Sequence, residues 1–186
     1  AVTFIRSIIN AQLGVVVHSD FARRAVESLL VEDVIVKRAN LPMACPDANV
    51  QDRPLTTVNI GLAGILAGIK GLDIIEQLAA SKDFAHCKLH VFGFNYDPEM
   101  VDRLRAYDNI TLGTDLTDAE FQSRLARLHV LVNFRHDYHG ETSRATLEAM
   151  RCGTVAIVRD IGWFSELPDS AVCKVGNASE IPAKLS

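Results

Sequence analysis

Residues 129–158 read HVLVNFRHDYHGETSRATLEAMRCGTVAIV, and this stretch decides the fold. Its β-branched and apolar run at 130–134 predicts a buried strand, and a second run at 154–158 predicts another. Between them, residues 143–151 predict a helix that ends at Gly153, a typical left-handed helix cap. A strand, a helix and a strand in this order form a right-handed crossover between two parallel strands.

The same alternation continues on both sides of this stretch. Further strands are predicted at 55–62, 88–92, 109–112 and 172–175, and further helices at 72–80, 98–107 and 117–128. Strands that alternate with helices indicate an α/β fold, here a Rossmann-like parallel sheet with helices on both faces. Such a sheet binds ligands beyond the carboxyl ends of its strands, where the strand order reverses.

The N-terminal part of the chain predicts a separate unit. Residues 15–17 and 34–36 predict short strands, and a helix between them begins at Ser19 or Asp20. Three prolines then punctuate a polar segment over 39–54, which is typical of a linker. We therefore expect residues 1–42 to be the tail of a preceding domain with its linker, and residues 43–186 to be the main domain.

Composition excludes several classes of function. A net charge of −4 argues against binding to nucleic acid, which needs a basic surface. The four cysteines form no C-x-x-C pair and lie at no zinc-ligand spacing, so we expect reduced thiols and no metal. The sequence shows no signal peptide, so we expect a cytoplasmic location.

One candidate ligand site is the glycine-rich stretch from Gly61 to Gly71, which contains Gly64, Gly68 and Lys70. We expect it to form a loop between a strand and a helix. Glycines let a backbone approach a ligand closely, and Lys70 would add a charge for a phosphate. Its spacing fits neither the dinucleotide fingerprint nor the P-loop. A flexible turn with a solvated lysine is an equally good interpretation of the spacing alone.

A second candidate site follows the strand at 130–134. Glu141, Thr142 and Ser143 fall at the start of a helix, where free N–H groups favour an anion, and Arg135 could clamp a phosphate. Glu148 could accept both hydroxyls of a ribose, although a surface ion pair with Arg144 or Arg151 is the simpler interpretation.

Two other pairs of residues are expected to have structural roles. His136 and His139 are expected to be solvated loop residues, and Trp163 and Phe164 to pack over the edge of the sheet.

Three segments together resemble the C-terminal half of family 4 retaining glycosyltransferases, which have the GT-B architecture. Gly64 through Lys70-Gly71 resembles the family's glycine-lysine loop, and residues 129–133 resemble its A-D-V-x-V strand. Residues 140–153 resemble its E-G…E-A-M-A-x-G element. The N-x-R, G-E-T-S and E-L-P elements at 133–135, 140–143 and 166–168 resemble a bacterial polysaccharide subgroup. His18 and Ser19 resemble the end of the acceptor-binding half, so residues 1–42 are expected to belong to it.

The resemblance implies a role for each candidate residue. Lys70 would hold the diphosphate of a UDP-sugar or GDP-sugar donor, and Glu148 the ribose. Glu141, Thr142 and Ser143 would face the donor sugar and phosphate, with Glu141, Arg135 and Lys70 taking part in catalysis. The nucleotide would also contact Gly64, Gly93, Leu112 and Thr114.

The resemblance also implies what the whole enzyme would do. It would retain the anomeric configuration of a hexose and need neither cofactor nor metal. The acceptor would be a saccharide or a lipid-linked molecule, and another domain would bind it. That domain could also associate with the membrane surface.

Two positions depart from the family pattern. Ile65 stands where the family has an arginine, and we hypothesise that Arg135 substitutes for it. Gly140 stands where the family has its first glutamate, so Glu141 comes one residue late. Two alternatives therefore stay open: a nicotinamide dehydrogenase, which lacks its fingerprint here, and a non-catalytic interaction or regulatory domain, which the missing arginine favours.

Overall fold

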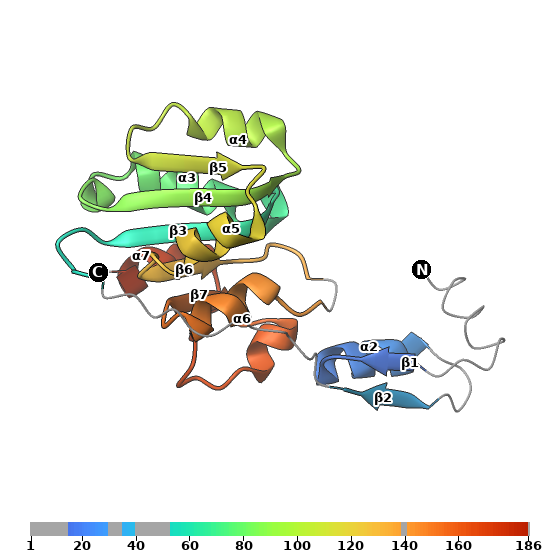
Figure 1. Ribbon diagram of the computed structural model, residues 1–186. Helices are drawn as coiled ribbons and strands as arrows, with labels where there is room; N and C mark the ends of the chain where they lie inside the picture. Colours follow the sequence, from blue (N-terminus) through green and yellow to red (C-terminus); the bar gives the residue numbers. More distant parts are fainter. Residues whose placement is uncertain (1–14, 30–34, 40–52, 139–140, 186) are drawn as a thin grey trace.

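A computed structural model describes residues 15–29, 35–39, 53–138 and 141–185. Its main feature is a six-stranded parallel sheet in the order β5-β4-β3-β6-β7-β8 (Figure 1). The strands are β3 (Asn59–Leu66), β4 (Lys88–Asn95), β5 (Ile110–Thr114), β6 (Val130–Asn133), β7 (Val155–Arg159) and β8 (Cys173–Val175). Counted from β3, this is the doubly wound Rossmann order, which reverses between β3 and β6.

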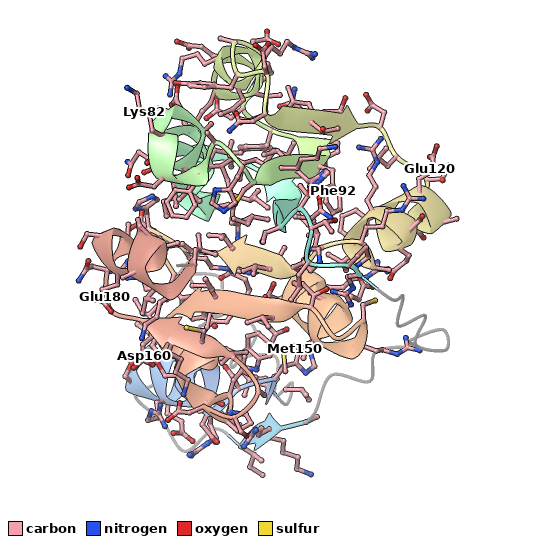
Figure 2. All side chains as sticks on the ribbon, turned by 90° about the vertical axis from the view of Figure 1, so that its left-hand side faces the viewer. Lys82, Phe92, Glu120, Met150, Asp160 and Glu180 are labelled. Atoms are coloured by element: carbon pink, nitrogen blue, oxygen red, sulfur yellow. The ribbon has the colours of Figure 1, made fainter. Side chains whose placement is uncertain are left out.

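Helices cover both faces of this sheet, as the sequence predicted. Figure 2 looks along the strands, with Lys82 and Glu180 marking one side and Glu120 and Met150 the other. The first side carries α3 (Leu72–Ala80), α4 (Pro98–Leu104) and α7 (Ile181–Leu185). The second carries α5 (Asp118–Leu125) and α6 (Arg144–Arg151).

Alternation along the strands produces these two layers. Leu89 and Val91 of β4 pack in the cluster that includes α3 and α4, whereas Phe92 packs with Leu125 and Ala149 of α5 and α6. Because successive strand residues point to opposite faces, one apolar run serves both layers.

Capping side chains place the helix ends close to where the sequence predicts them. Thr117 and Glu120 form a capping box at the start of α5, and Asp97 accepts the Met100 N–H at the start of α4. Gly153 has φ 72°, which confirms the left-handed cap after α6.

The strand before the glycine-rich loop begins and ends four residues later than predicted. The sequence indicated a strand over 55–62 and a loop from Gly61, but β3 continues to Leu66, so Gly61 and Gly64 lie in the sheet. Close packing explains Gly61, whereas Gly64 has a φ of 113°, which favours glycine. A Cβ on Gly61 would lie 2.5 Å from the Leu128 side chain, and a Cβ on Gly93 would lie 1.8 Å from the Gly64 carbonyl oxygen. The loop therefore shortens to 67–71, which includes the 3₁₀ helix η1 (Gly68–Lys70).

A second, two-stranded parallel sheet lies apart from the first (Figure 1). It pairs β1 (Val15–Val17) with β2 (Val36–Arg38), which begins two residues later than predicted, and α2 (Asp20–Leu29) connects them. The predicted linker falls largely outside the described residues, so the domain boundary stays a prediction. No helix within the described ranges has the length and apolarity needed to cross a membrane.

Candidate functional site

The two strands at the reversal of strand order bring three predicted residues together. β3 leads into η1, which carries Lys70, and β6 leads directly into Phe134 and Arg135. Lys70 Nζ lies 3.0 Å from Glu141 Oε1, and Arg135 Nη1 contacts the same oxygen. Lys70, predicted from the glycine-rich stretch, and Arg135 and Glu141, predicted from the segment after β6, therefore form one cluster of two cations and one carboxylate.

Arg135 is the buried member of this cluster. Its residue is 4% exposed, and its guanidinium carbon lies 5.2 Å from the ring centroid of Phe164 and 5.8 Å from that of Tyr138. Burial lowers the pKa of Arg135 from its ordinary value, and its Nε has no hydrogen-bond partner within the described structure. The rings of Phe164 and Tyr138 thus lie against the Arg135 cation, whose Nε is a hydrogen-bond donor without a partner in the described structure.

Lys70 is the cation whose charge is most sensitive to its surroundings. Burial, and then the neighbouring charge of Arg135, lower the pKa of Lys70 to about 8. Two cations against one carboxylate leave a surplus positive charge at neutral pH. An anionic ligand would relieve the repulsion between Lys70 and Arg135, which is the electrostatic property of an anion site.

A pocket of about 300 Å³ lies at the same carboxyl-end edge of the sheet, between α5, α6 and the ends of β3 and β4. Its lining residues are Gly64, Ile65, Gly93, Phe94, Asp115, Leu116, Asp118, Phe121, Arg144, Ala145 and Glu148. Gly64, Gly93 and Glu148 were predicted from the sequence, whereas Phe94, Asp115 and Phe121 were missed. The missed residues leave no motif; only the strand order brings them to one place.

Glu148 lies at the wall of the pocket and is only 3% exposed. Its Oε1 accepts a hydrogen bond from Arg144 Nε at 2.6 Å, which is the predicted ion pair. The pair is not on an open surface, however, because the Glu148 side chain is buried. Its Oε2 is buried without a hydrogen-bond partner in the described structure, which is costly for a carboxylate and points to a ligand donor.

The charges around the pocket differ from those of the cluster. Asp115, Asp118 and Glu148 line the pocket against a single lining cation, Arg144. An acidic wall disfavours a phosphate there, whereas the Lys70 and Arg135 cluster favours one. The site is therefore polarised, with a place for an anion at one end and a place for a neutral, hydroxyl-bearing group at the other.

A buried polar cluster joins β6 to the start of α6. Asn133 Nδ2 donates to Ser143 Oγ at 2.8 Å and to Thr146 Oγ1 at 2.7 Å, and Ser143 Oγ also accepts the Thr146 N–H. The Ser143 hydroxyl is thus the N-cap of α6 and is buried. Its expected contact with the sugar or phosphate stays a prediction. Asn133, an amide at the end of an apolar strand, was the available sequence signal for this cluster.

The structure places the remaining predicted residues as follows. Leu112 packs against the core cluster instead of lining the pocket, and Asp115 and Leu116 take the place expected for Leu112 and Thr114. The reason is that β5 extends to Thr114, so the loop that borders the pocket begins two residues later than expected. Thr142 is half-buried, directly before the α6 N-cap.

His136, Trp163 and Phe164 were expected to have structural roles, and the structure places them accordingly. His136 is on the surface and contacts Asp73 at 2.8 Å, and Trp163 and Phe164 are buried against β7. His139 and Gly140 lie outside the described residues. Cys87 and Cys173 are free thiols, and no group of potential metal ligands occurs among the described side chains.

Comparison with known proteins connects this geometry to a fold. No family model and no curated protein matches the sequence. Among solved structures, Anabaena HepE in complex with UDP-glucose has 15% identity and a TM-score of 0.76, over 100% of this chain and 57% of that one. S. aureus TarM has 16% identity and a TM-score of 0.71, over 92% of this chain and 35% of that one.

The C-terminal domain of the group 1 glycosyltransferase LpcC from Francisella tularensis gives a third match. It has 19% identity and a TM-score of 0.52, over 69% of this chain and 73% of that one. The chain therefore has the fold of the C-terminal domain of GT-B glycosyltransferases. It spans little more than half the length of HepE.

Proposed function

We propose that this chain is the donor-binding domain of a glycosyltransferase that uses a nucleotide sugar. The observation that carries the proposal is the polarised site, in which Lys70 and Arg135 converge at the reversal of strand order, at the same edge of the sheet as a pocket with the unpartnered oxygen of Glu148. A nucleotide sugar has matching parts: an anionic diphosphate and a neutral nucleoside with two adjacent hydroxyls. HepE, whose fold is similar, was solved with UDP-glucose.

In the proposed complex, the diphosphate takes the place of the Glu141 carboxylate between the two cations. The start of α6 lies beside this position and adds the positive end of a helix dipole. The ribose hydroxyls donate to Glu148, and the base lies against Phe94 and the closely packed backbone at Gly93.

In this proposal, Arg135 supplies the positive charge that is missing at Ile65. Ile65 lines the pocket and is 53% exposed, so the position that carries an arginine in the resembling family offers no charge here. Arg135 supplies a second cation from the other side of Lys70, which supports the hypothesis that it substitutes for the family arginine.

The chemistry assigned to these residues is stabilisation of a leaving group. Breaking the bond between the anomeric carbon and the diphosphate develops negative charge on the diphosphate, and Lys70 and Arg135 would neutralise it without a metal or cofactor. Glu141, displaced by the diphosphate, would face the sugar. We further propose hexose transfer with retention, in the cytoplasm, to a saccharide or lipid-linked acceptor that another domain of the complete enzyme binds, in association with the membrane surface.

Calorimetric titration of the folded chain with UDP, GDP and ADP tests this function directly. We expect one of the three to bind, and we expect Lys70→Ala to weaken that binding. Absence of binding by all three would contradict the proposal. Binding of NAD in place of all three would favour the dehydrogenase alternative.

A further inference from the structure

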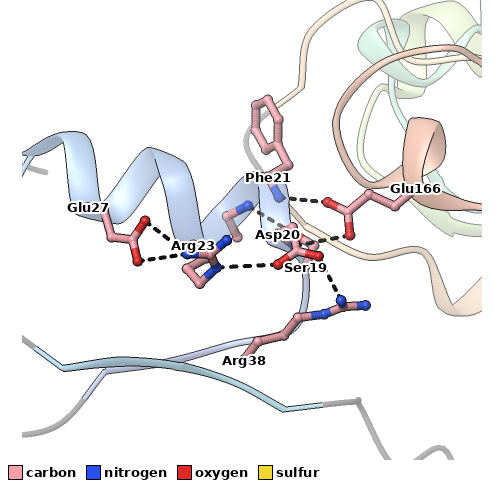
Figure 3. A network of polar contacts seen from close by, with 8 residues as sticks. Ser19, Asp20, Phe21, Arg23, Glu27, Arg38 and Glu166 are labelled. Atoms are coloured by element: carbon pink, nitrogen blue, oxygen red, sulfur yellow. Dashed lines mark hydrogen bonds and ion pairs between the residues drawn. The ribbon is translucent and has the colours of Figure 1, made fainter.

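Helix α2 is attached to the main sheet by a side chain from the distant end of the sequence. Glu166 Oε2 accepts the Asp20 N–H at 3.0 Å, and Glu166 Oε1 accepts the Phe21 N–H at 2.6 Å (Figure 3). Ser19 Oγ accepts the Ala22 N–H at 3.0 Å, so the sequence-predicted cap is also present. Glu166 therefore satisfies two of the N–H groups that a helix leaves free at its start. It belongs to η3 (Gly162–Glu166), the 3₁₀ helix after β7.

Tyr138 forms the second attachment of α2. The Phe21 ring meets the Tyr138 ring edge-on, with centroids 5.2 Å apart. The Tyr138 ring also lies directly on η3, because a Cβ on Gly162 would come within 1.9 Å of it. Gly162 has φ 61°, which a side chain would disfavour as well.

The same tyrosine reaches the anion site. Its hydroxyl donates to the Glu141 carbonyl oxygen at 2.7 Å and accepts the Trp163 N–H at 2.8 Å. Its ring centroid is 5.8 Å from the Arg135 guanidinium carbon. Tyr138 thus contacts α2, η3 and two of the three members of the charged cluster.

We propose that Tyr138 is a positioning residue, which fixes Glu141 and Arg135 for the diphosphate when α2 is packed against η3. The identity of the anion rests on the proposed function, whereas the contacts do not depend on it. Without the hydroxyl, the backbone at Glu141 loses its attachment to η3, and a ligand must then order that backbone as it binds. Burial raises the pKa of Tyr138, so its hydroxyl stays a donor throughout the neutral range.

This position gives α2 an influence on donor binding. α2 precedes the predicted linker, in the part of the chain that we assign to the acceptor-binding side. Any movement that separates α2 from Glu166 and Phe21 from Tyr138 would loosen one wall of the anion site. The affinity for the diphosphate would then report whether the two sides of the enzyme are in contact.

The first test is Tyr138→Phe, which keeps the ring and removes only the hydroxyl. We expect affinity for the nucleoside diphosphate that binds best among UDP, GDP and ADP to fall roughly fivefold to twentyfold. Affinity for the corresponding nucleoside should not change, because the pocket at Glu148 is untouched. A merely structural role would weaken both ligands together. Tyr107→Phe is the matched control, since Tyr107 lies between α4 and β5, away from the site.

The second test is Glu166→Gln, which keeps the shape of the side chain, removes its charge and lies outside the ligand site. We expect the same selective loss of diphosphate affinity. In the double variant with Tyr138→Phe, we expect the loss of diphosphate affinity to be smaller than the sum of the two single losses. Glu76→Gln, which breaks a surface ion pair with Arg103, is the control. This test stands even if Tyr138→Phe does not fold.

The outcomes separate the two proposals. If the unaltered chain binds none of the three diphosphates, the proposed function fails and this inference fails with it. If the unaltered chain binds and either variant binds the diphosphate equally well, the inference alone is overturned. Equal weakening of nucleoside and diphosphate by Tyr138→Phe would also overturn it.

Discussion

Lys70 and Arg135 show how single residues define the site. Two cations that share one carboxylate oxygen would repel each other, and burial adds to this by removing water from both. Burial of Lys70, and then the neighbouring charge of Arg135, lower the pKa of Lys70 to about 8. Arg135 is the stronger base and keeps its proton. Glu148 shows the complementary case, an acceptor oxygen buried without a donor.

The first prediction concerns the pH dependence of diphosphate binding. Lys70 is charged below its pKa of about 8 and becomes neutral above it, whereas a bound diphosphate would keep it charged. Affinity should therefore be nearly constant from pH 7 to 8 and fall by up to about tenfold per unit above pH 8. Calorimetry across pH 7–9.5 measures this, and Lys70→Arg should remove the dependence. A flat profile for the unaltered chain would contradict the assignment.

The second prediction separates the two ends of the site. Glu148→Ala should weaken nucleoside binding roughly tenfold and leave pyrophosphate binding unchanged, because only the ribose contacts are lost. Lys70→Ala should do the reverse, weakening pyrophosphate roughly tenfold to hundredfold. Competition titrations with the nucleoside and with pyrophosphate give both values. If each variant affected both ligands equally, the polarity of the site would be wrong.

At the scale of elements, the site depends on how closely β3 and β4 approach each other and on how α6 begins. Gly64 and Gly93 are register partners in adjacent strands, and both have positive φ. Their missing side chains leave backbone at the floor of the pocket. The Asn133, Ser143 and Thr146 cluster then holds the first turn of α6 against β6, next to the cations.

The third prediction follows from the glycine pair. Gly93→Ala should destabilise the fold by about 3 kcal/mol or more, because its Cβ would overlap the Gly64 carbonyl and its φ of 143° disfavours a side chain. Urea denaturation measures the change. Gly68→Ala is the control, since its Cβ would meet Asp97 and Met100 at an ordinary 3.6 Å. Equal stability of the two variants would contradict the strand register.

The fourth prediction tests the start of α6. Ser143→Ala should lower the free energy of unfolding by about 1–3 kcal/mol, because it removes the N-cap and leaves Asn133 with one acceptor fewer. Ser123→Ala, at an exposed position of α5, should change it by less than about 0.5 kcal/mol. Thermal or urea unfolding compares the two. Any fall in nucleotide affinity in Ser143→Ala should come only from the weaker attachment of the first turn of α6 to β6.

At the scale of the whole molecule, the chain has one sheet that carries the proposed ligand site and one small sheet attached to it through Glu166 and Tyr138. It spans 57% of HepE. In the function we propose, the site described here supplies donor binding only. Binding and transfer should therefore separate in this chain.

The fifth prediction states that separation. The chain should be stabilised by its nucleoside diphosphate, by about 2.7 kcal/mol at a ligand concentration of one hundred times Kd, which raises Tm by roughly 5–10 °C. It should nevertheless release no nucleoside diphosphate from the matching nucleotide sugar when an acceptor saccharide is added. Thermal unfolding and a coupled product assay measure these. Transfer by the chain alone would refute the proposed division of labour.

The sequence by itself determined the order of the six strands of the main sheet and of helices α3 to α6, and it singled out Lys70, Arg135, Glu141 and Glu148 as candidates. These are local properties: hydrophobic periodicity, capping residues and clusters of charged residues are all visible within a few positions. Helix α3, predicted at 72–80 and found as Leu72–Ala80, shows how far such signals reach.

Only the tertiary structure decided that Glu148 is buried, that the Ser143 hydroxyl caps α6, and that Phe94 and Asp115 line the pocket. It alone joined Glu166 and Tyr138 to α2, across a sequence separation of 145 residues or more for Glu166. Contacts of this kind arise from the packing of distant segments around one sheet, and no local pattern of residues records them.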